Sequence, residues 1–230
     1  MKQANKVCDL QSCFLCARCV PAWQQAIAQH KENRRFKKGA KIFSEGAPVE
    51  GIFFLYSGTV KIHKRWGSEK ELIVGFARTG DIVGYRGWGR DMQYPVSATA
   101  LEDVVMCFVD TDFFEATLQA NHNLTYEFMK FYAGELQDAE RRMRDLALME
   151  VKGRVADMLL MLKKKFGTDK QGFIDITLTR QDMASYSGTT YETFFRMMNE
   201  LVKEKLIKVS GKQIAIVKEK QLEALTLFAG

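Results

Sequence analysis

The sequence has few of the residues and motifs that an enzyme needs. Only 3 of its 230 residues are histidines. We find no Ser/His/Asp or Cys/His arrangement for nucleophilic catalysis, no P-loop, and no Gly-x-Gly-x-x-Gly run after a predicted strand. These absences argue against a hydrolase and against a nucleotide-dependent enzyme, so we expect a protein that is not an enzyme.

The sequence also lacks the segments that would direct it to a membrane. No apolar run approaches the roughly 18 residues needed to span a bilayer. Lys2 and Lys6 are followed by no apolar stretch, so the start of the chain does not look like a signal peptide. With 3 prolines in all, no proline-rich tract indicates a disordered arm. We expect a cytoplasmic protein without a membrane partner.

Positive charge is concentrated in the last third of the chain. The whole sequence has 34 Lys+Arg and 28 Asp+Glu, a net charge of +6. Residues 151–230 contain 14 basic and 9 acidic residues, a net of +5, whereas residues 1–150 contain 20 and 19, a net of +1. This asymmetry is typical of a C-terminal domain that binds a polyanion such as DNA; the alternative is a merely soluble basic domain.

The segment 34–110 has the pattern of a small antiparallel β-structure. Ten of the 17 glycines lie between Gly39 and Gly89. The segment's β-rich runs are Ile52-Phe53-Phe54-Leu55-Tyr56, Val60-Lys61-Ile62-His63, Leu72-Ile73-Val74 and Val104-Val105-Met106-Cys107-Phe108-Val109. Short strands with frequent turns predict a barrel or roll. We expect a tight hairpin turn at Ser57-Gly58 and a surface position for His63 on its strand.

A long helix is predicted after this segment. From Leu124 to Leu148 the chain has no proline and only one glycine, and apolar residues recur at steps of three or four. These are Leu124, Phe128, Tyr132, Leu136, Ala139, Met143 and Leu146. A long helix with an apolar seam between two domains predicts a dimer interface. The alternative is a helix that packs on its own barrel.

The strongest local pattern covers residues 178–196. Thr179 can cap a first helix, and Gly188 can supply the turn after it. Thr189 or Thr190 can then cap a second helix, on which Phe194 faces the shared core. Two β-rich runs, Leu206-Ile207-Lys208-Val209 and Ile214-Ala215-Ile216-Val217, then flank a basic tip at Ser210-Gly211-Lys212. These parts predict a helix-turn-helix with a wing; the alternative is an ordinary helical hairpin.

The second helix of such a motif lies in the major groove, where its N-terminal residues reach base edges. The residues expected there are Tyr191, Glu192, Phe195 and Arg196. Arginine suits guanine O6/N7 and glutamate accepts from cytosine N4, whereas phenylalanine offers only apolar contact, for example to a thymine methyl group. The residues expected to contact phosphates, which fix register, are Arg180, Gln181, Thr190 and Lys212.

With these motifs the sequence resembles the CRP/FNR family of regulators over nearly its whole length. The resemblance rests on the predicted roll, the long helix, Leu178-Thr179-Arg180-Gln181, Glu192-Thr193, Arg196 and Val209-Ser210-Gly211-Lys212. It implies that Glu192 and Arg196 read the inner bases of each half-site of an inverted repeat. The family varies at the residue between them, and a phenylalanine such as Phe195 is unusual there.

The resemblance implies an α+β chain with three structural parts: an N-terminal antiparallel β-roll of the cyclic-nucleotide-binding (jelly-roll) type, a long dimerisation helix and a C-terminal winged helix-turn-helix. We expect a cysteine-rich arm and helix at 1–33, the roll at 34–111, the dimerisation helix region at 112–149 and the DNA-binding domain at 150–230. The expected partners are double-stranded DNA, a second copy of the chain and RNA polymerase.

Cyclic AMP is not expected as the effector. In members that bind it, a glutamate follows a Gly-Asp-hydrophobic pair-Gly run, and an Arg-Ser pair helps to hold the phosphate. Here Tyr85 follows Gly80-Asp81-Ile82-Val83-Gly84, and Val96-Ser97 replaces the Arg-Ser pair. A buried phosphodiester would therefore lack its charge partner. Arg86 and Arg90 leave open an anion bound in another geometry.

The cysteines are crowded into the start of the chain. Four of the 5 lie within the first 19 residues, which in a reducing cytosol favours metal or redox chemistry. The stretch from Tyr94 to Glu102 and then Met106-Cys107 resembles the part of oxygen-sensing members that carries a lone cluster-ligating cysteine. The resemblance implies a 4Fe–4S cluster on Cys13, Cys16, Cys19 and Cys107. The Cys-x2-Cys-x2-Cys spacing is tighter than in those members but occurs in ferredoxin loops.

Other interpretations of the cysteines remain open. Cys8 and the other three N-terminal cysteines would suit structural zinc, and the thiols could act as redox sensors or be inert, with Cys107 as a small buried hydrophobe. The resemblance predicts that cluster assembly shifts the dimer or its DNA-binding heads, and that oxygen or nitric oxide reverses this. The alternative regulator has a small-molecule effector or none. An iron–sulfur electron carrier would leave the winged motif unexplained.

Overall fold

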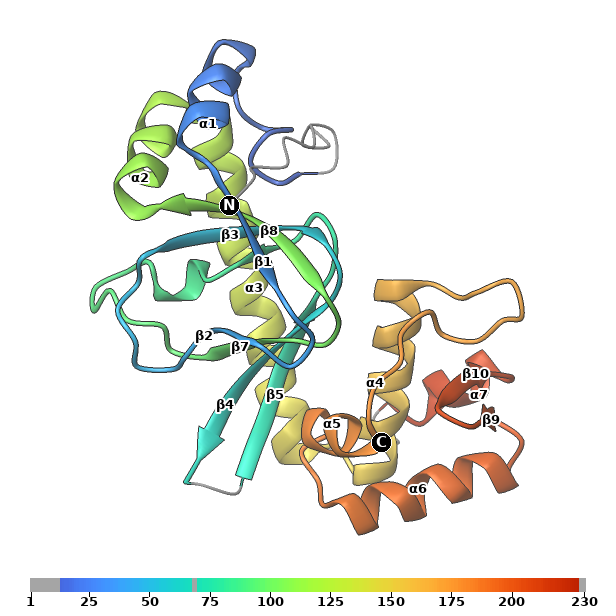
Figure 1. Cartoon of the computed structure of the whole chain (residues 1–230). Coiled ribbons are helices and arrows are strands. Elements are labelled where there is room, and N and C mark those ends of the chain that lie inside the picture. The colour runs from blue at the N-terminus through green and yellow to red at the C-terminus, as the bar shows by residue number, and fades with distance from the viewer. Residues whose placement is uncertain (1–12, 68–69, 228–230) are drawn as a thin grey trace. The chain divides into compact units, whose positions relative to one another are not determined.

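The computed structural model describes residues 13–67 and 70–227, and the chain divides into two compact units, residues 1–135 and 136–230 (Figure 1). The division falls inside helix α3 (His122–Leu148), so each unit contains one part of this helix. Among the described residues, no helix is both long and apolar enough to cross a bilayer.

Two four-stranded antiparallel sheets form the β-roll of the first unit. One sheet has the order β1-β8-β3-β6, with the bounds Glu32–Phe36, Val104–Asp110, Gly51–Ser57 and Ile82–Val83. The other has the order β2-β7-β4-β5, with the bounds Lys41–Phe43, Ser97–Ala100, Val60–Trp66 and Lys70–Ala77. The helical segments of this unit besides α3 are η1 (Pro21–Trp23), α1 (Gln24–His30), η2 (Tyr85–Gly87) and α2 (Thr111–Ala120).

Strand β3 is buried on both faces, which explains its unbroken apolar run. Successive side chains of a strand point to opposite faces. Phe53 and Leu55 lie in the core that contains residues of both sheets. Ile52 and Phe54 lie in a second core, which includes residues of α2 and of the first half of α3. We call this second core the arm core, because it also contains Cys13, Phe14, Leu15, Cys16 and Cys19.

The expected hairpin at Ser57-Gly58 is absent, and this prediction was wrong. Strand β3 pairs with β6 and β8, whereas β4 pairs with β5 and β7, so the chain passes from one sheet to the other at this turn. The local signal was real: Gly58 has a φ of +94°, and a Cβ there would lie 2.8 Å from the Asp103 carbonyl oxygen. A turn signal identifies the turn but not the sheet that the next strand joins.

The second unit has a helical core with a two-stranded hairpin. Its elements are α4 (Val151–Phe166), α5 (Arg180–Tyr186), α6 (Tyr191–Lys203), β9 (Ile207–Ser210), β10 (Gln213–Ile216) and α7 (Glu219–Ala224). Helix α4 contacts α5, α6 and α7, and β9 pairs with β10 in antiparallel register. The roll, the long helix and the winged helix-turn-helix are thus confirmed.

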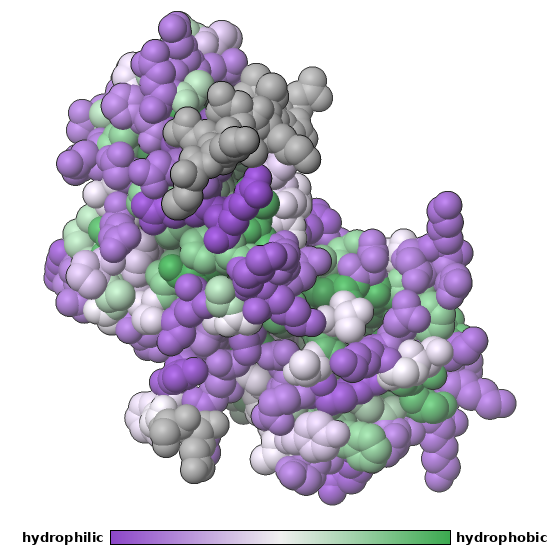
Figure 2. All heavy atoms as spheres, viewed as in Figure 1, coloured by the Kyte–Doolittle hydropathy of each residue, from purple (hydrophilic) through white to green (hydrophobic). Residues whose placement is uncertain are grey.

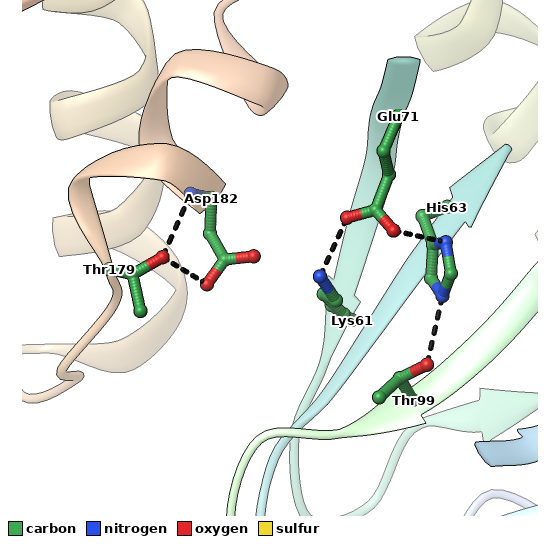
Figure 3. A network of polar contacts seen from close by, with 6 residues as sticks. All are labelled: Lys61, His63, Glu71, Thr99, Thr179 and Asp182. Atoms are coloured by element: carbon green, nitrogen blue, oxygen red, sulfur yellow. Dashed lines mark hydrogen bonds and ion pairs between the residues drawn. The ribbon is translucent and has the colours of Figure 1, made fainter. Parts of the chain in front are cut away.

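His63 is buried, with 1% of its surface exposed, although a surface position was expected. Its Nδ1 lies 2.8 Å from Glu71 Oε2 and its Nε2 lies 2.9 Å from Thr99 Oγ1, while Lys61 Nζ lies 2.6 Å from Glu71 Oε1 (Figure 3). Strands β4, β5 and β7 each contribute to this network. A polar side chain can be buried when its partners are buried with it, and the neighbouring strands supply those partners.

The network should make stability depend on acid pH. The pKa of Glu71 is lowered from 4.5 to about 2, first by its hydrogen bond to His63 and then by the Lys61 ammonium, although burial acts to raise it. This stabilisation is therefore present above the ordinary carboxyl pKa and is lost as the pH falls towards 2. In urea unfolding, Glu71→Gln should be less stable than wild type near neutral pH, and the difference should shrink in acid. The exposed Glu102, changed to Gln, is the control; an unchanged difference across this range would contradict the prediction.

Candidate DNA-binding surface and cysteine cluster

Two threonines fix the starts of the helices in the helix-turn-helix. Thr179 Oγ1 accepts from the Asp182 backbone N–H at 3.0 Å and lies 2.6 Å from Asp182 Oδ2 (Figure 3). At the start of α6, Thr190 Oγ1 accepts from the Thr193 backbone N–H at 3.3 Å. Each bond satisfies a backbone donor that the first helical turn leaves open. Of the two threonines considered for the second cap, the structure uses Thr190.

The turn between α5 and α6 requires glycine for two reasons. Gly188 has a φ of +62°, and a Cβ on it would lie 2.5 Å from Leu146 Cδ2. Beyond the turn, Phe194 is fully buried, as predicted for a residue of the shared core. Leu146, which was expected in a dimer seam, therefore packs against the helix-turn-helix of its own chain.

Two arginines that sequence reasoning did not identify hold this motif in place. Arg154 of α4 donates to the carbonyl oxygens of Met149 at 2.7 Å and Ser187 at 2.9 Å. Arg142 of α3 donates to the Tyr186 carbonyl oxygen at 2.9 Å, and its guanidinium lies 3.8 Å from the centre of the Tyr186 ring. Their targets are backbone carbonyls at the end of α5 and in the loop before α4, which carry no sequence signal of their own.

Helix α6 presents one buried and one exposed face. Its buried residues are Phe194, Met197, Met198 and Leu201. The four residues expected to read bases are all outside this buried set, namely Tyr191, Glu192, Phe195 and Arg196, and each is exposed. In Figure 2, which has the view of Figure 1, hydrophobic residues in green lie at the surface in the region of α6. Tyr191 and Phe195 have 42% and 51% of their surface exposed. The structure thus brings together the residues that the sequence assigned to this face.

The residues expected to contact phosphates differ in how exposed they are. Lys212 is exposed in the turn between β9 and β10, and Gln181 is exposed on α5. Arg180 is half-buried, and its Nη2 donates to the Gly211 carbonyl oxygen at 3.2 Å, which connects the start of α5 to the tip of the wing. Thr190 is exposed, and its hydroxyl serves as the cap of α6.

The apolar stripe predicted on α3 divides between two environments. Leu124 and Phe128 are buried in the arm core of their own chain, so the structure corrects their assignment to a dimer seam. Tyr132 is half-buried and its hydroxyl donates to the Tyr85 carbonyl oxygen at 2.5 Å. Leu136, Ala139 and Met143 remain exposed. Residues three or four apart on a helix recur on the same side, and two such stripes are present here.

The second stripe is exposed along the length of α3. Its residues recur at alternating steps of three and four, as Tyr126, Met129, Ala133, Leu136, Glu140, Met143 and Ala147. Met129, Leu136 and Met143 have 60%, 61% and 67% of their surface exposed. This is the a/d spacing of a coiled-coil seam, with Glu140 as its one charged position.

The four cysteines of the proposed cluster lie in one apolar environment. Cys13, Cys16, Cys19 and Cys107 are all buried, and all belong to the arm core. Cys107 lies on β8, opposite Phe54 of β3. Burial, and secondly the nearby Cys13, raise the pKa of the Cys19 thiol to about 11. This thiol therefore carries its proton at neutral pH and would have to lose it to bind a metal. Cys8 lies outside the described residues.

Polar contacts attach the residues just after the cysteines to α2 and its C-cap, and an aromatic contact attaches the cysteine segment to α3. The Val20 backbone N–H donates to Asn121 Oδ1 at 2.9 Å, and Trp23 Nε1 donates to Thr117 Oγ1 at 3.0 Å. The Phe14 ring packs edge-on against Phe131, with the ring centres 5.3 Å apart. The segment is thus part of the folded first unit.

The donor set fits a four-thiolate metal group in kind, number and burial. Three thiols come from one short segment and the fourth from a neighbouring strand, and an apolar shell surrounds all four. In the part of the chain that the structure describes, no three His, Cys, Asp or Glu side chains are grouped closely enough to hold a metal ion. The thiols would therefore have to come closer together on binding.

Tyr85, which stands where the resemblance places the phosphate-binding glutamate, and its neighbour Arg86 both contact Glu135 of α3. The Tyr85 hydroxyl donates to the Glu135 carboxylate, and Arg86 Nη2 lies 2.7 Å from Glu135 Oε2. Burial raises the pKa of Tyr85 well above its ordinary value, which keeps its hydroxyl protonated. Because Glu135 already compensates the Arg86 charge, this geometry gives no support to an anion there; Arg90 is exposed.

Comparison with known families matches both units. Residues 33–121 match the family described as "Cyclic nucleotide-binding domain", and residues 153–225 match the "Crp-like helix-turn-helix domain". The chain is 31% identical over 187 residues to the anaerobic regulatory protein of Bacillus subtilis (strain 168), covering 79% of each chain. It is 26% identical over 233 residues to the fumarate and nitrate reduction regulatory protein of Escherichia coli (strain K12), covering 96% of this chain and 90% of the relative.

Solved structures share the fold. FixK2 from Bradyrhizobium japonicum superimposes with a TM-score of 0.78 at 24% identity, covering 87% of this chain and 99% of that chain. A transcriptional regulator of the CRP/FNR family from Thermus thermophilus has a TM-score of 0.68 at 23% identity, covering 86% and 100%. At such identities the likeness concerns the fold.

Proposed function

The chain belongs to the CRP/FNR family of DNA-binding transcription regulators, and from this premise we propose that it acts as a homodimer on inverted-repeat DNA under the control of its core cysteines. The observation that carries the DNA-binding part is the exposed face of α6, which combines Glu192 and Arg196 with aromatic neighbours above a fully buried Phe194. RNA polymerase is the further partner that a transcription regulator of this kind requires.

We assign base reading to α6 and phosphate contacts to the residues around it. Glu192 and Arg196 are four residues apart and share one side of the exposed face, so both reach one groove. Arg196 suits the O6 and N7 atoms of guanine, and Glu192 suits the amino group of cytosine. Lys212 at the wing tip, with Gln181 and Thr190, suits phosphates, whereas Arg180 positions the wing through the Gly211 carbonyl.

Base reading and phosphate contact should separate in a mutational test. Arg196→Ala should weaken binding to the selected site by about 1–3 kcal/mol and relax discrimination at one base pair of each half-site, because a bidentate contact is lost. Lys212→Ala should weaken binding to all sequences alike and reduce its salt dependence. Fluorescence anisotropy with selected and random duplexes measures both effects. Equal losses on random DNA would contradict the assignment.

We propose that the exposed stripe on α3 forms the seam of the dimer. Its a/d spacing suits a second, parallel copy of the same helix, and its exposed methionines and leucine would lose their contact with water there. Of the residues expected in the seam from sequence, Leu136 and Met143 belong to this stripe. Tyr126 and Met129 are added to it, because they are exposed where Leu124 and Phe128 are buried.

Leu136→Glu should weaken the dimer. Burying one leucine contributes roughly 1.5–3 kcal/mol, and the change affects both copies, so we expect the dissociation constant to rise at least about tenfold. Sedimentation equilibrium measures it. Leu148→Glu is the matched control, because Leu148 is 79% exposed on the same helix but lies outside the a/d positions. The same dissociation constant in Leu136→Glu and wild type would refute the seam.

We propose that Cys13, Cys16, Cys19 and Cys107 hold a 4Fe–4S cluster that makes DNA binding sensitive to oxygen or redox state. Such a cluster supplies redox chemistry and a link that oxygen or nitric oxide can break. The support is the shared apolar environment of the four thiols, together with a relative named as an anaerobic regulatory protein and one named for fumarate and nitrate reduction. The alternatives are structural zinc that includes Cys8, and an effector that does not use the cysteines.

Packed side chains lead from the cysteine segment to α3. Phe14, between Cys13 and Cys16, packs on Phe131, and Phe131 packs on Tyr85 with ring centres 4.8 Å apart. Tyr85 in turn bonds to Glu135, one residue before Leu136 of the exposed stripe. A change at the cysteines can therefore reach the seam through direct contacts.

Metal analysis of protein purified without oxygen should give about four iron and four sulfide per chain. Cys107→Ala should remove both and abolish the oxygen dependence of DNA binding, whereas Cys8→Ala should leave both unchanged. Circular dichroism checks that each variant is folded. Zinc that survives Cys107→Ala but not Cys8→Ala would make the arm structural, and protein without metal that binds DNA tightly would favour another effector or none.

A further inference from the structure

Two aromatic side chains on α6 have no role in the core of the second unit. Tyr191 and Phe195 are four residues apart, 42% and 51% exposed, and their ring planes are nearly parallel at 10°, with centres 6.4 Å apart. The buried face of α6 is filled by other residues, including Phe194 and Leu201. The pair therefore forms an apolar strip that water covers in the unbound chain.

The strip runs beside the polar residues assigned to base reading. Tyr191 precedes Glu192 and Phe195 precedes Arg196, and each row is spaced by four residues. Residues four apart on a helix form a row, so an aromatic row and a charged row lie next to each other. Whatever groove receives Glu192 and Arg196 also receives the two rings.

DNA offers one apolar group in the major groove, the C5 methyl group of thymine. Covering two exposed rings with such methyl groups removes apolar surface of both partners from water, which is favourable. Phosphates and the polar edges of the other bases would instead be desolvated without a hydrogen bond by the Phe195 ring. The chemistry of the strip therefore selects thymine.

We propose that Tyr191 and Phe195 act together as a second base-reading element that takes thymine methyl groups next to the base pairs read by Glu192 and Arg196. This inference rests on the proposed DNA-binding function. It assigns the specificity of adjacent half-site positions to methyl contacts and gives Phe195, the unusual residue between the two polar readers, a positive role.

The test removes single methyl groups from DNA. A preferred site is first selected from random duplexes with the wild-type chain, and the base pair whose preference Arg196→Ala relaxes is located. Each thymine in the neighbouring pairs is then replaced by deoxyuridine, which keeps the base pairing and removes only the methyl group. We expect about a fourfold loss of affinity at each contacted position, the value of one buried methyl-sized group.

Substitutions of Tyr191 and Phe195 test whether the rings cause the loss of affinity on removal of a methyl group. In Phe195→Ala, thymine and deoxyuridine should bind equally well at the position that Phe195 contacts. Phe195→Leu should keep a preference for thymine, because it retains an apolar side chain, and Tyr191→Phe should keep it without the hydroxyl. Val202→Ala is the matched control, because Val202 is an exposed apolar residue in the C-terminal half of α6.

The outcomes separate this inference from the proposed function. If wild type selects no sequence, both the base-reading function and this inference fail. If it selects a sequence that Arg196→Ala relaxes, but removal of every neighbouring methyl group leaves affinity unchanged, the methyl-reading role alone is overturned. A methyl effect that persists unchanged in both Phe195→Ala and Tyr191→Ala overturns it as well.

Discussion

Burial of both faces of the central strands β3 and β8 is the constraint on which the first unit depends. Met106 and Phe108 of β8 point into the core shared by the two sheets, while Cys107 and Val109 point into the arm core. The second sheet covers one face, but the other needs a separate cover. The residues 13–19, α2 and the first half of α3 provide it, so the cysteine segment and the long helix share one apolar core with Cys107.

The same aromatic contacts of α3 both complete the core of the first unit and hold the cysteine segment. The rings of Phe128 and Phe131 pack against Phe14 of the cysteine segment, and Tyr85 packs on Phe131 from the roll. The face of α3 that stabilises the first unit is therefore also the face that meets the cysteines. The other stripe of α3 is exposed, and it is the one that we propose for the contact with a second copy of the chain.

Local signals in the sequence predicted the helix-turn-helix well. The caps at Thr179 and Thr190, the turn at Gly188 and the core position of Phe194 depend on neighbouring residues, which a linear pattern contains. The errors arose where segments distant in the sequence determine which side chains are buried. Both stripes of α3 recur at steps of three and four residues, so the sequence alone could not tell that Leu124 is buried and Met129 is exposed.

Polar burial was also beyond the reach of the sequence pattern. His63 is buried because Glu71 and Thr99 of neighbouring strands contact its ring nitrogens. Arg154 donates to backbone carbonyl oxygens, which every residue has, so the residue types in the sequence do not indicate its hydrogen-bond partners. Similarly, Gly58 indicated a turn, but it did not indicate that the next strand joins the other sheet.

The close fit of Gly188 against Leu146 shows where this chain can be divided. Leu146, Arg142 and Arg154 connect the last turns of α3 to the helix-turn-helix, so this motif is packed together with a part of the helix that precedes it. A chimeric regulator with exchanged DNA specificity would have to carry its own end of α3. The natural junction for such a transplant is near residue 136, and a cut in the loop before α4 would separate side chains that have been fitted to each other.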